Sequence, residues 1–201
     1  MCVVLARHLR LIRGIDMRIN KFCVVFAGLT LMISPTALMA SHCAPPKQPM
    51  KLSSSAFKYG QRIPQMFTAD GSDISPPLFF TNVPKHTKKL VLICEDPDAP
   101  GGTFVHWVIY DMLGNSESVP EGLSPRRDLS DGSRQGVNSF GGVGYNGPSP
   151  ASGKPHRYYF WLYAVDKRLH LPARATADQV RCTIHGHIMA EAKLMGTYSR
   201  P

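Results

Sequence analysis

KLVLICED at residues 89–96 and RYYFWLYAVD at residues 157–166 are the two stretches that decide the fold. The first is apolar and β-branched, and the second is apolar on both faces, as a central strand covered on two sides would be. Strands are predicted at 51–57, 78–82, 89–95, 104–112 and 157–165. This pattern predicts a mainly β protein, and a two-sheet β-sandwich with peripheral helices fits it best.

The composition favours one domain. The chain has 201 residues, of which 43% are hydrophobic and 18% are charged, which is ordinary for a globular protein with one sizeable core. The 17 glycines and 17 prolines favour short strands and turns over long helices. We therefore expect one domain over residues 51–201, preceded by a Pro-rich lead-in at 41–50.

The first 40 residues have the organisation of an export signal. MRINK, starting at Met17, is followed by the apolar run FCVVFAGLTLMIS and by PTALMA, which are the three parts of a secretory signal peptide. The apolar run is too short for a comfortable membrane span. We expect Met17 to be the start, residues 1–16 to be an upstream extension, and cleavage to follow Ala40; the alternative is a buried N-terminal helix. The predicted location is periplasmic or secreted, without stable membrane insertion after cleavage.

The charge distribution gives no support to a nucleic-acid partner. Residues 1–40 hold five of the 23 Lys and Arg and one of the 14 Asp and Glu, so the remainder carries a formal net charge of +5 instead of +9. Basic doublets near the body of the protein include Lys88-Lys89 and Arg126-Arg127, and no aromatic-basic stripe accompanies them. Such doublets are usually solvated charges, and nucleic-acid binding is not predicted.

Three cysteines follow the predicted cleavage site. Export would place Cys43, Cys94 and Cys182 in a compartment where disulfides form. Cys94 falls in an apolar strand and Cys182 on a predicted helix, so both are interpreted first as small buried hydrophobic residues. The sequence does not determine their pairing.

A helix is predicted near the C-terminus. Thr176 and Gln179 have the spacing of a capping box, and Val180, Ile184 and Ile188 recur on one face, with Gly196 as a helix stop. His185 and His187 would lie on this helix, two residues apart, where side chains diverge and do not share a metal. The chain has no HExxH or CxxC pattern, and no metal or cofactor is predicted.

The DPDAP motif at 96–100 follows a predicted strand directly. Its prolines hold the backbone around Asp96 and Asp98, so both carboxylates have fixed directions at the strand end. Two interpretations stay open: a ligand site, and a rigid turn in which the side chains accept local backbone N–H groups. Spacing alone favours the turn.

His106 and Trp107 open the strand predicted at 104–112. Adjacent strand residues face opposite sides of a sheet, so one of the two is expected to point inward and the other outward. A single histidine in a strand is more often a hydrogen-bonded structural residue than a ligand or a base.

His156 and Tyr158 are two apart on the next strand and share a face, with Arg157 on the other face. That shared face could offer an imidazole and a phenol to one ligand. The ordinary alternative is a tyrosine that is buried with its hydroxyl satisfied.

The stretch 113–156 is rich in Gly, Ser, Pro and Asn and has no periodicity. A connection of this length in a compact domain is usually functional or disordered. Within it, Gly147 between Asn146 and Pro148 suits a turn that presents backbone N–H groups to an anion. Serine hydrolysis lacks support, because there is no G-x-S-x-G and Ser149 follows a proline.

These motifs, taken in order, resemble the phosphatidylethanolamine-binding protein family, in its bacterial Raf-kinase-inhibitor-like branch. The resemblance runs from about residue 51 to residue 200. It is carried by DGSDISPPL (70–78), DPDAP (96–100), HWVIYDM (106–112), RQGVNSFGGVGYNGP (134–148), HRYYFWLYAVD (156–166) and HIMAEAKLMGTY (187–198).

The resemblance implies a β-sandwich with a small pocket that takes phosphate-like anions. Carried over motif by motif, the pocket positions are Asp96, His106, Gly147, His156 and Tyr158. Asp96 would orient or charge an imidazole and not touch the anion, since two negative groups repel. Because several donors converge and no activated nucleophile is visible, the leading prediction is a non-catalytic protein that binds a small anionic or phosphorylated ligand.

The sequence also departs from the family pattern. The loop GGTFV at 101–105 is shorter than in the family's eukaryotic members, and Asn146 and Ser149 stand where bacterial relatives often carry Gly and Cys. Kinase inhibition is therefore not carried over to this chain.

Two other functions stay open. One is a hydrolase in which Asp96 and His106 or His156 act as an acid–base pair. The other is an interaction protein that inhibits a protein partner, such as a protease, through the 113–156 loop.

Overall fold

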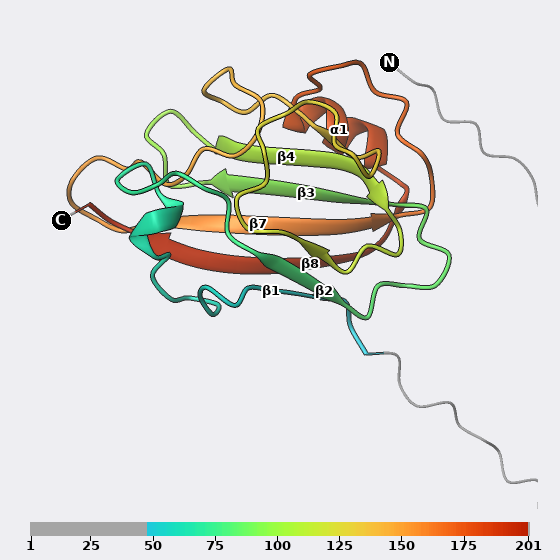
Figure 1. The fold of residues 1–201 in the computed structure, drawn as a ribbon, viewed down its shortest axis with the longest axis horizontal. Coiled ribbons are helices and arrows are strands. Elements are labelled where there is room, and N and C mark those ends of the chain that lie inside the picture. The colour runs from blue at the N-terminus through green and yellow to red at the C-terminus, as the bar shows by residue number, and fades with distance from the viewer. Residues whose placement is uncertain (1–47, 201) are drawn as a thin grey trace, which may run out of the picture. The chain divides into compact units, whose positions relative to one another are not determined.

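The computed structural model describes residues 48–200. The predicted signal peptide, the start at Met17, Cys43 and most of the lead-in at 41–50 lie outside the described residues. The fold is mainly β, with two sheets and a short helix (Figure 1), so the predicted fold class is confirmed. No helix in this part of the chain is long and apolar enough to cross a membrane.

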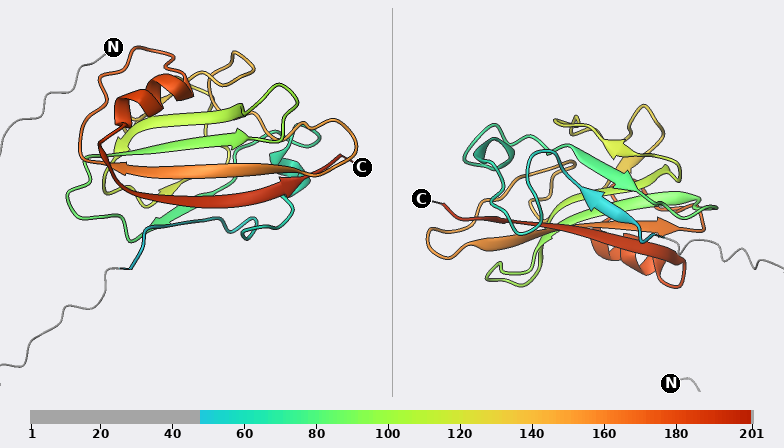
Figure 2. Two further views of the ribbon diagram at one scale, coloured as in Figure 1. Left: turned by 180° about the vertical axis from the view of Figure 1, so that it is seen from behind. Right: turned by 90° about the horizontal axis from the view of Figure 1, so that it is seen from below.

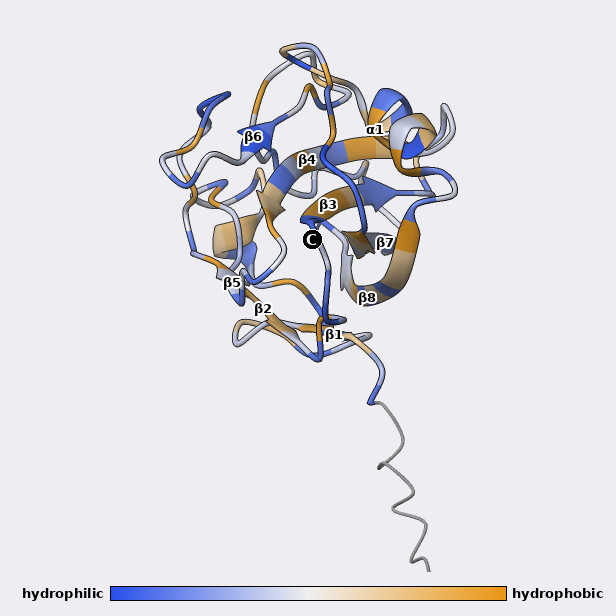
Figure 3. Cartoon of the chain, turned by 90° about the vertical axis from the view of Figure 1, so that its right-hand side faces the viewer, coloured by the Kyte–Doolittle hydropathy of each residue, from blue (hydrophilic) through white to orange (hydrophobic). Residues whose placement is uncertain are grey.

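All strand pairs within the two sheets are antiparallel. The smaller sheet has the order β1-β2-β5, formed by Lys51–Ser53, Leu78–Thr81 and Ser118–Val119. The larger has the order β6-β4-β3-β7-β8, formed by Arg134–Gln135, Phe104–Leu113, Lys89–Asp96, His156–Val165 and Ile188–Tyr198. Figure 3 shows the two layers end-on, with β1, β2 and β5 on one side and the larger sheet on the other.

Two apolar clusters hold the layers together. The larger cluster lies between the sheets and includes Phe80 of β2 and Phe160 of β7. The smaller one joins the outer face of the larger sheet to helix α1 (Ala177–Ile184), with Val180 and Val91 among its members. Figure 2 shows the helix lying across that face beside β4.

Strand β3 is covered on both faces, as its sequence predicts. Leu90, Leu92 and Cys94 belong to the cluster between the sheets, and Val91 and Ile93 belong to the cluster under the helix. Burying each large aliphatic side chain contributes roughly 1.5–3 kcal/mol. A central position in two layers therefore explains the nearly continuous apolar run.

Strand β7 differs from the prediction over most of its length, because its fully buried side chains lie mainly on the face toward the smaller sheet, and on the other face only Val165 belongs to the cluster under the helix. Phe160 and Leu162 are buried between the sheets, whereas Tyr159, Trp161 and Tyr163 on the opposite face are half-buried. Their neighbouring rings stack on each other, with centroids 6.0 and 6.3 Å apart. The short helix packs beside β4 and leaves this aromatic row partly open.

The C-terminal helix is shorter than predicted. The capping box of Thr176 and Gln179 is confirmed, but the helix ends at Ile184, and Gly186 follows with φ +77°. Ile188 is therefore in strand β8 and not on the helix, and His185 and His187 flank the turn between the two elements. The apolar spacing up to Ile188 resembled a helix, but pairing along the whole of β7 decided the structure.

Gly196, predicted to be a helix stop, is instead a packing position within β8. A Cβ atom at this residue would lie 2.5 Å from Ile63 Cγ1 and 2.8 Å from Phe57 Cε2. Its neighbours two residues away, Leu194 and Tyr198, are buried in the core between the sheets. The close approach of other side chains is therefore what requires glycine here.

The 113–156 connection is folded onto the sandwich. It contains β5 and β6, and Gln135 of β6 is fully buried, where its Oε1 accepts from Trp107 Nε1 at 2.7 Å. The Gln135 amide nitrogen donates to the carbonyl oxygens of Ser124 and Arg126, both at 2.8 Å. Strand β1 is shorter than the predicted strand 51–57, because it ends at Ser53.

Candidate functional site

A pocket of about 260 Å³ opens where β3 ends and where β4 and β7 begin. Four of the five predicted site residues line it. The lining consists of Asp96, Ala99, Pro100, Phe104, His106, Phe140, Ser149, Pro150, Ala151, His156 and Tyr158. Three strand ends therefore bring together residues that are up to 62 positions apart in the sequence.

A β-bulge directs His106 into this pocket. Trp107 pairs with Cys94 and Val105 pairs with Glu95, so the register skips His106. His106 and Trp107 are both buried, at 3% and 0% exposure, which contradicts the expectation that one of them faces outward. The extra residue of a bulge breaks the two-residue alternation and re-aims a side chain, which explains the difference.

The hydrogen bond of the His106 ring determines which nitrogen carries a hydrogen when the imidazole is neutral. The Nδ1 atom lies 2.7 Å from the backbone oxygen of Asn146, which can only accept, so Nδ1 carries the hydrogen. Burial lowers the pKa of His106 below its ordinary value, although the Asn146 carbonyl and the Asp96 carboxylate act in the opposite direction. Nε2 consequently remains as an acceptor.

Asp96 joins the turn to the pocket. Its Oδ2 lies 2.7 Å from His156 Nδ1, and its Oδ1 accepts from the backbone N–H of Asp98 at 2.8 Å. The side chain of Asp96 is buried, and its hydrogen bond to Nδ1 fixes the orientation of the His156 ring. The turn and the site were alternative interpretations of DPDAP, and this carboxylate takes part in both.

Asp98 and Arg157 clamp the turn to the first residues of β7. Asp98 Oδ1 accepts from Arg157 Nη2 at 2.6 Å, and Asp98 Oδ2 accepts from Nε and from the backbone N–H of Arg157, both at 2.9 Å. The hydrogen bond to Arg157 lowers the pKa of Asp98 to about 2. Arg157 thus lies on the face opposite His156, as predicted.

Tyr158 provides a donor that no protein group uses. The residue is 1% exposed, and its hydroxyl is the buried side-chain polar atom in residues 48–200 that has no hydrogen-bond partner. Burial, followed by the nearby Asp96 carboxylate, raises the pKa of Tyr158 well above its ordinary value, so the hydroxyl stays protonated. By ordinary hydrogen-bond geometry this hydroxyl is therefore not satisfied within the described residues, although the Asp96 carboxylate and the Ser149 backbone lie near it, and a buried donor without a partner requires an explanation.

Gly147 does not have the arrangement that was predicted. Its N–H donates to Asp73 Oδ1 at 2.6 Å, and the residue does not line the pocket. A Cβ atom here would lie 2.4 Å from the backbone oxygen of Phe67. Glycine therefore allows two backbone segments to approach closely. Its amide is not available to a ligand, because it already donates a hydrogen bond to Asp73, a residue far away in the sequence.

Comparisons with known proteins identify the family to which this fold belongs. A family model described as phosphatidylethanolamine-binding protein matches residues 53–199. The chain belongs to the phosphatidylethanolamine-binding protein family. The predicted resemblance is therefore confirmed over most of the chain.

Members of this family in other organisms cover the domain almost completely. A UPF0098 protein of Methanothermobacter thermautotrophicus is 46% identical over 151 residues, which are 75% of this chain and 99% of the relative. A UPF0098 protein of Archaeoglobus fulgidus is 40% identical in an alignment of length 193 that covers 90% of this chain and 66% of the relative.

Solved structures agree with the fold. The crystal structure of a putative phosphatidylethanolamine-binding protein homologue from Chlamydia trachomatis is 40% identical and superposes with a TM-score of 0.69, covering 76% of this chain and 99% of that one. YbcL of E. coli, described as a member of the mammalian family, is 26% identical with a TM-score of 0.71, covering 77% and 100%.

Several pocket residues of this family member were missed by sequence reasoning. Phe104 and Phe140 form an aromatic rim, with ring centroids 4.8 Å apart, and Phe140 is 52% exposed. Ser149, which the sequence singled out only as a departure from the family and as a poor nucleophile, lines the pocket and accepts a hydrogen bond from Arg200 Nη2 at 3.0 Å. The apolar rim gives no local signal, because isolated phenylalanines in loops occur in many roles.

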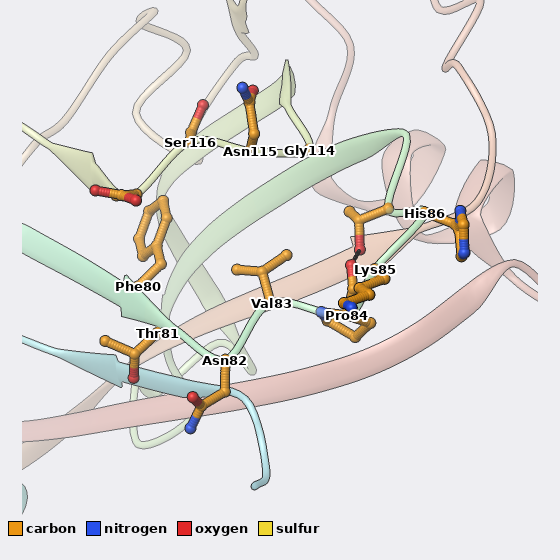
Figure 4. A pocket seen from close by; sticks show the side chains of 12 residues that line it. Phe80, Thr81, Asn82, Val83, Pro84, Lys85, His86, Gly114, Asn115 and Ser116 are labelled. Atoms are coloured by element: carbon orange, nitrogen blue, oxygen red, sulfur yellow. Dashed lines mark hydrogen bonds between the residues drawn. The ribbon is translucent and has the colours of Figure 1, made fainter. Parts of the chain in front are cut away.

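A larger hollow of about 640 Å³ lies elsewhere, between the turns that follow β2 and β4 (Figure 4). It is lined by Phe80, Val83, Asn115 and other residues at 80–87 and 114–117. None of the predicted site residues is among them, and no buried polar side chain without a partner faces it in the described residues. We therefore place the candidate site in the smaller pocket, where the titratable groups converge.

In the part of the chain that the structure describes, the remaining histidines and cysteines form no second centre. Residues 48–200 contain no group of three or more His, Cys, Asp or Glu side chains that could hold a metal. His187 pairs with Asp166 at 2.8 Å. Cys94 is buried as predicted, but Cys182 is exposed and not buried, because it lies on the solvent side of α1; neither forms a disulfide in the described part of the chain.

Proposed function

We propose that the protein binds a small ligand through a phosphate or phosphate-like group in this pocket, without transforming it. The observation that carries the proposal is the buried hydroxyl of Tyr158, which has no protein partner and lines the same pocket as His106 and His156. Leaving such a donor unsatisfied costs about 1–3 kcal/mol, so a ligand that accepts from it gains that free energy.

The pocket has further groups suited to an anion. His156 lines the pocket, and the hydrogen bond between its Nδ1 and Asp96 Oδ2 fixes the orientation of its ring. The Ser149 oxygen already accepts from Arg200, so its own hydrogen is available. Hydrogen bonds from such groups to an anion contribute roughly 1.5–3 kcal/mol each.

The size and the rim of the pocket limit the ligand. A volume of about 260 Å³ is at the small end for ligand pockets and suits a head group more than a large molecule. The exposed ring of Phe140 and the prolines Pro100 and Pro150 offer apolar contacts to whatever the anionic group is attached to. A phosphorylated small molecule or a lipid head group meets both requirements.

Binding is favoured over hydrolysis by the position of Ser149. An activated nucleophile needs a hydrogen bond to a base, and Ser149 Oγ bonds to Arg200 and to neither pocket histidine in residues 48–200. A hydrolase that uses the Asp96–His156 pair with water is the second candidate, because this pair has the geometry of an oriented general base. Turnover of a phosphate ester that disappears in His156→Ala would promote it.

Export is part of the proposal and is tested separately. The leader at residues 17–40 has the three parts of a signal peptide. Cell fractionation with N-terminal sequencing of the mature protein is expected to recover it outside the cytoplasm with an N-terminus near Ser41. Recovery of an uncut chain in the cytoplasm would contradict export and leave the pocket proposal intact.

Calorimetric titration with inorganic phosphate and with phosphoethanolamine tests the binding proposal. We expect saturable binding, with a loss of roughly 10- to 100-fold in Tyr158→Phe and in His156→Ala, as the loss of one hydrogen bond to an anion predicts. His187→Ala is the matched control, since His187 has a similar histidine–aspartate pair outside the pocket. Equal affinity in all three variants would remove the proposal.

A further inference from the structure

Strand β8 is an edge strand of the larger sheet, and part of its edge has no partner. The sheet has the order β6-β4-β3-β7-β8, so β7 pairs with one side of β8 (Figure 1). On the other side, a loop covers only the C-terminal part of the strand. The Gly60 N–H donates to the Met195 carbonyl oxygen at 2.8 Å, and Thr197 bonds to Gln61 and Ile63 at 2.9 and 2.8 Å. In residues 48–200, no backbone group pairs with this side of β8 before Met195.

The alternation of the strand identifies which backbone groups are open. Because the N–H and C=O groups of Thr197 point away from β7, those of Glu191 and Lys193, at even spacing from it, do so as well. The register with β7 is unbroken from Tyr198 to Ala190, so no bulge changes this alternation. Within the described residues, Glu191 and Lys193 therefore each present an unpaired backbone donor and an unpaired backbone acceptor at the sheet edge.

The side chains of these two residues are exposed and oppositely charged. Both lie on the face of the sheet that carries the aromatic row of β7, and Lys193 Nζ lies 5.2 Å from the centroid of a ring of Trp161. Neither forms an ion pair in the described part of the chain. Charges protect a sheet edge against self-pairing when they repel in every register. A neighbouring Glu and Lys do not protect it, because one register brings each opposite the other.

The edge can pair with a second copy of itself in a register that satisfies its hydrogen bonds and its charges together. In an antiparallel pairing about a two-fold axis at Ala192, Glu191 of each copy lies opposite Lys193 of the other in a hydrogen-bonded pair. An axis at Glu191 or at Lys193 places like charges directly opposite each other, which is destabilising. A shift by one residue faces the open groups with groups that already pair with β7. The pairing ends at Met195, because the Gly60 amide occupies its carbonyl oxygen.

We propose that two copies of the chain pair through β8, antiparallel and centred on Ala192, so that their larger sheets form one continuous sheet. A second copy is the partner that fits, because its reversed strand presents Lys193 and Glu191 in the order that the register requires. The contact is short, so we expect a weak dimer that exchanges with monomer. This inference goes beyond the proposed binding function and does not depend on it, so the two proposals fail independently.

Sedimentation equilibrium of the purified protein measures the association. We expect monomer and dimer in exchange, with a dissociation constant of roughly 1–100 µM. Glu191→Lys and Lys193→Glu each place like charges opposite each other at two symmetric positions, and each should weaken association roughly tenfold or more. The double variant with both substitutions restores opposite charges, so its dissociation constant should return to within about threefold of the value for the unsubstituted protein.

A disulfide test determines the register. In the proposed dimer, Ala192 faces its own copy in a non-hydrogen-bonded pair, where the Cα atoms are about 4.5 Å apart and a disulfide can form. Ala192→Cys, with Cys43 and Cys182 replaced by serine, should therefore give a covalent dimer under mild oxidation. Ala190→Cys is the matched control. Ala190 packs against the same cluster and is partly buried like Ala192, but would lie more than about 10 Å from its copy.

The outcomes are distinct. A concentration-dependent dimer that the single charge variants weaken and the double variant restores, with a cross-link at residue 192 and none at 190, supports the proposal. A monomer at every concentration up to about 1 mM overturns it, whether the edge stays open or takes a strand of another protein. A dimer that tolerates the single charge variants, or that cross-links equally at both positions, uses another surface and also overturns it. If a charge variant does not fold, the two cysteine variants still decide.

Discussion

Asp98 and Arg157 show how single residues set the site. Their hydrogen bonds tie the turn after β3 to the start of β7. The pocket pair Asp96–His156 lies beside this clamp, because His156 precedes Arg157 in β7 and Asp96 is two residues before Asp98. The β3–β7 ladder ends at the pair Glu95–Tyr159, and the clamp and the buried pair are side-chain contacts that join the two strands beyond it. The partly exposed clamp therefore supports both the stability and the geometry of the site.

Asp98→Asn is expected to lower the free energy of unfolding by roughly 1 kcal/mol at neutral pH, since the pair is bidentate but partly exposed. Hydrogen bonding to Arg157 lowers the pKa of Asp98 to about 2. A lowered pKa in the folded state gives stability above the unfolded value of about 4 that is lost as pH falls through about 2. Urea unfolding at several pH values should show the difference between the two proteins shrinking with acidification.

Asp128→Asn is the control for the previous prediction, since Asp128 pairs with Arg127 and Arg134 at a half-exposed surface. Such pairs contribute little, so a change of a few tenths of a kcal/mol is expected. A larger effect in the control than in Asp98→Asn would contradict the clamp.

Gly147→Ala tests the close contact of two backbone segments. The added Cβ would lie 2.4 Å from the Phe67 carbonyl oxygen, and a backbone atom cannot move away without shifting its neighbours. Overpacking of this kind costs about 1–3 kcal/mol. Thermal unfolding should show the loss, whereas Gly101→Ala, which meets nothing within 4 Å, should leave stability nearly unchanged.

Among the secondary-structure elements, helix α1 depends most clearly on its neighbours. It has eight residues, too few for stability alone, and depends on its capping box and on the apolar cluster beneath it. Beyond it, Gly186 turns the chain so that β8 can pair along the whole of β7. The length of the helix and the length of β8 are therefore linked, because the pairing of β8 with β7 decides where the helix ends.

Thr176→Ala is expected to destabilise the protein by about 1 kcal/mol, because it removes the side-chain acceptor for the Gln179 N–H. Thr183→Ala is the matched control within the same helix, since its hydroxyl only bonds back to the Gln179 carbonyl and should matter little. Chemical denaturation of both variants measures the difference, and equal midpoints would show that the cap contributes nothing.

At the scale of the whole molecule, the sandwich brings the end of β3 and the starts of β4 and β7 together, and loop residues complete the pocket there. Asp96, His106 and His156 come from different strands of the larger sheet, and Phe140 and Ser149 come from the 113–156 connection. Residues of the C-terminal end also reach the pocket wall through the Arg200–Ser149 hydrogen bond. The site therefore depends on the integrity of the entire domain.

Cysteine labelling reports on that integrity. Cys94 is buried between the sheets and burial raises the pKa of its thiol, whereas Cys182 is exposed on α1. We expect an alkylating reagent to modify Cys182 in the native protein and Cys94 only when the domain unfolds. Peptide mass spectrometry at increasing urea should place Cys94 modification at the global transition; rapid native labelling of Cys94 would contradict a closed core.

From the sequence alone, the strand runs, the capping box and four pocket residues could be predicted. Alternation, capping and motif spacing are properties of neighbouring residues, so the two strands around KLVLICED and RYYFWLYAVD and the shared face of His156 and Tyr158 followed from local rules. The same locality explains why β8 was mistaken for more helix.

Only the tertiary structure decided which groups of the site are free and which are occupied. The bulge that turns His106 inward, the capture of the Gly147 N–H by Asp73 and the unpaired hydroxyl of Tyr158 each depend on partners at least 10 positions away or on the lack of one. A hydrogen bond is settled by which atoms the fold brings within about 3 Å, and spacing along the chain does not contain that information.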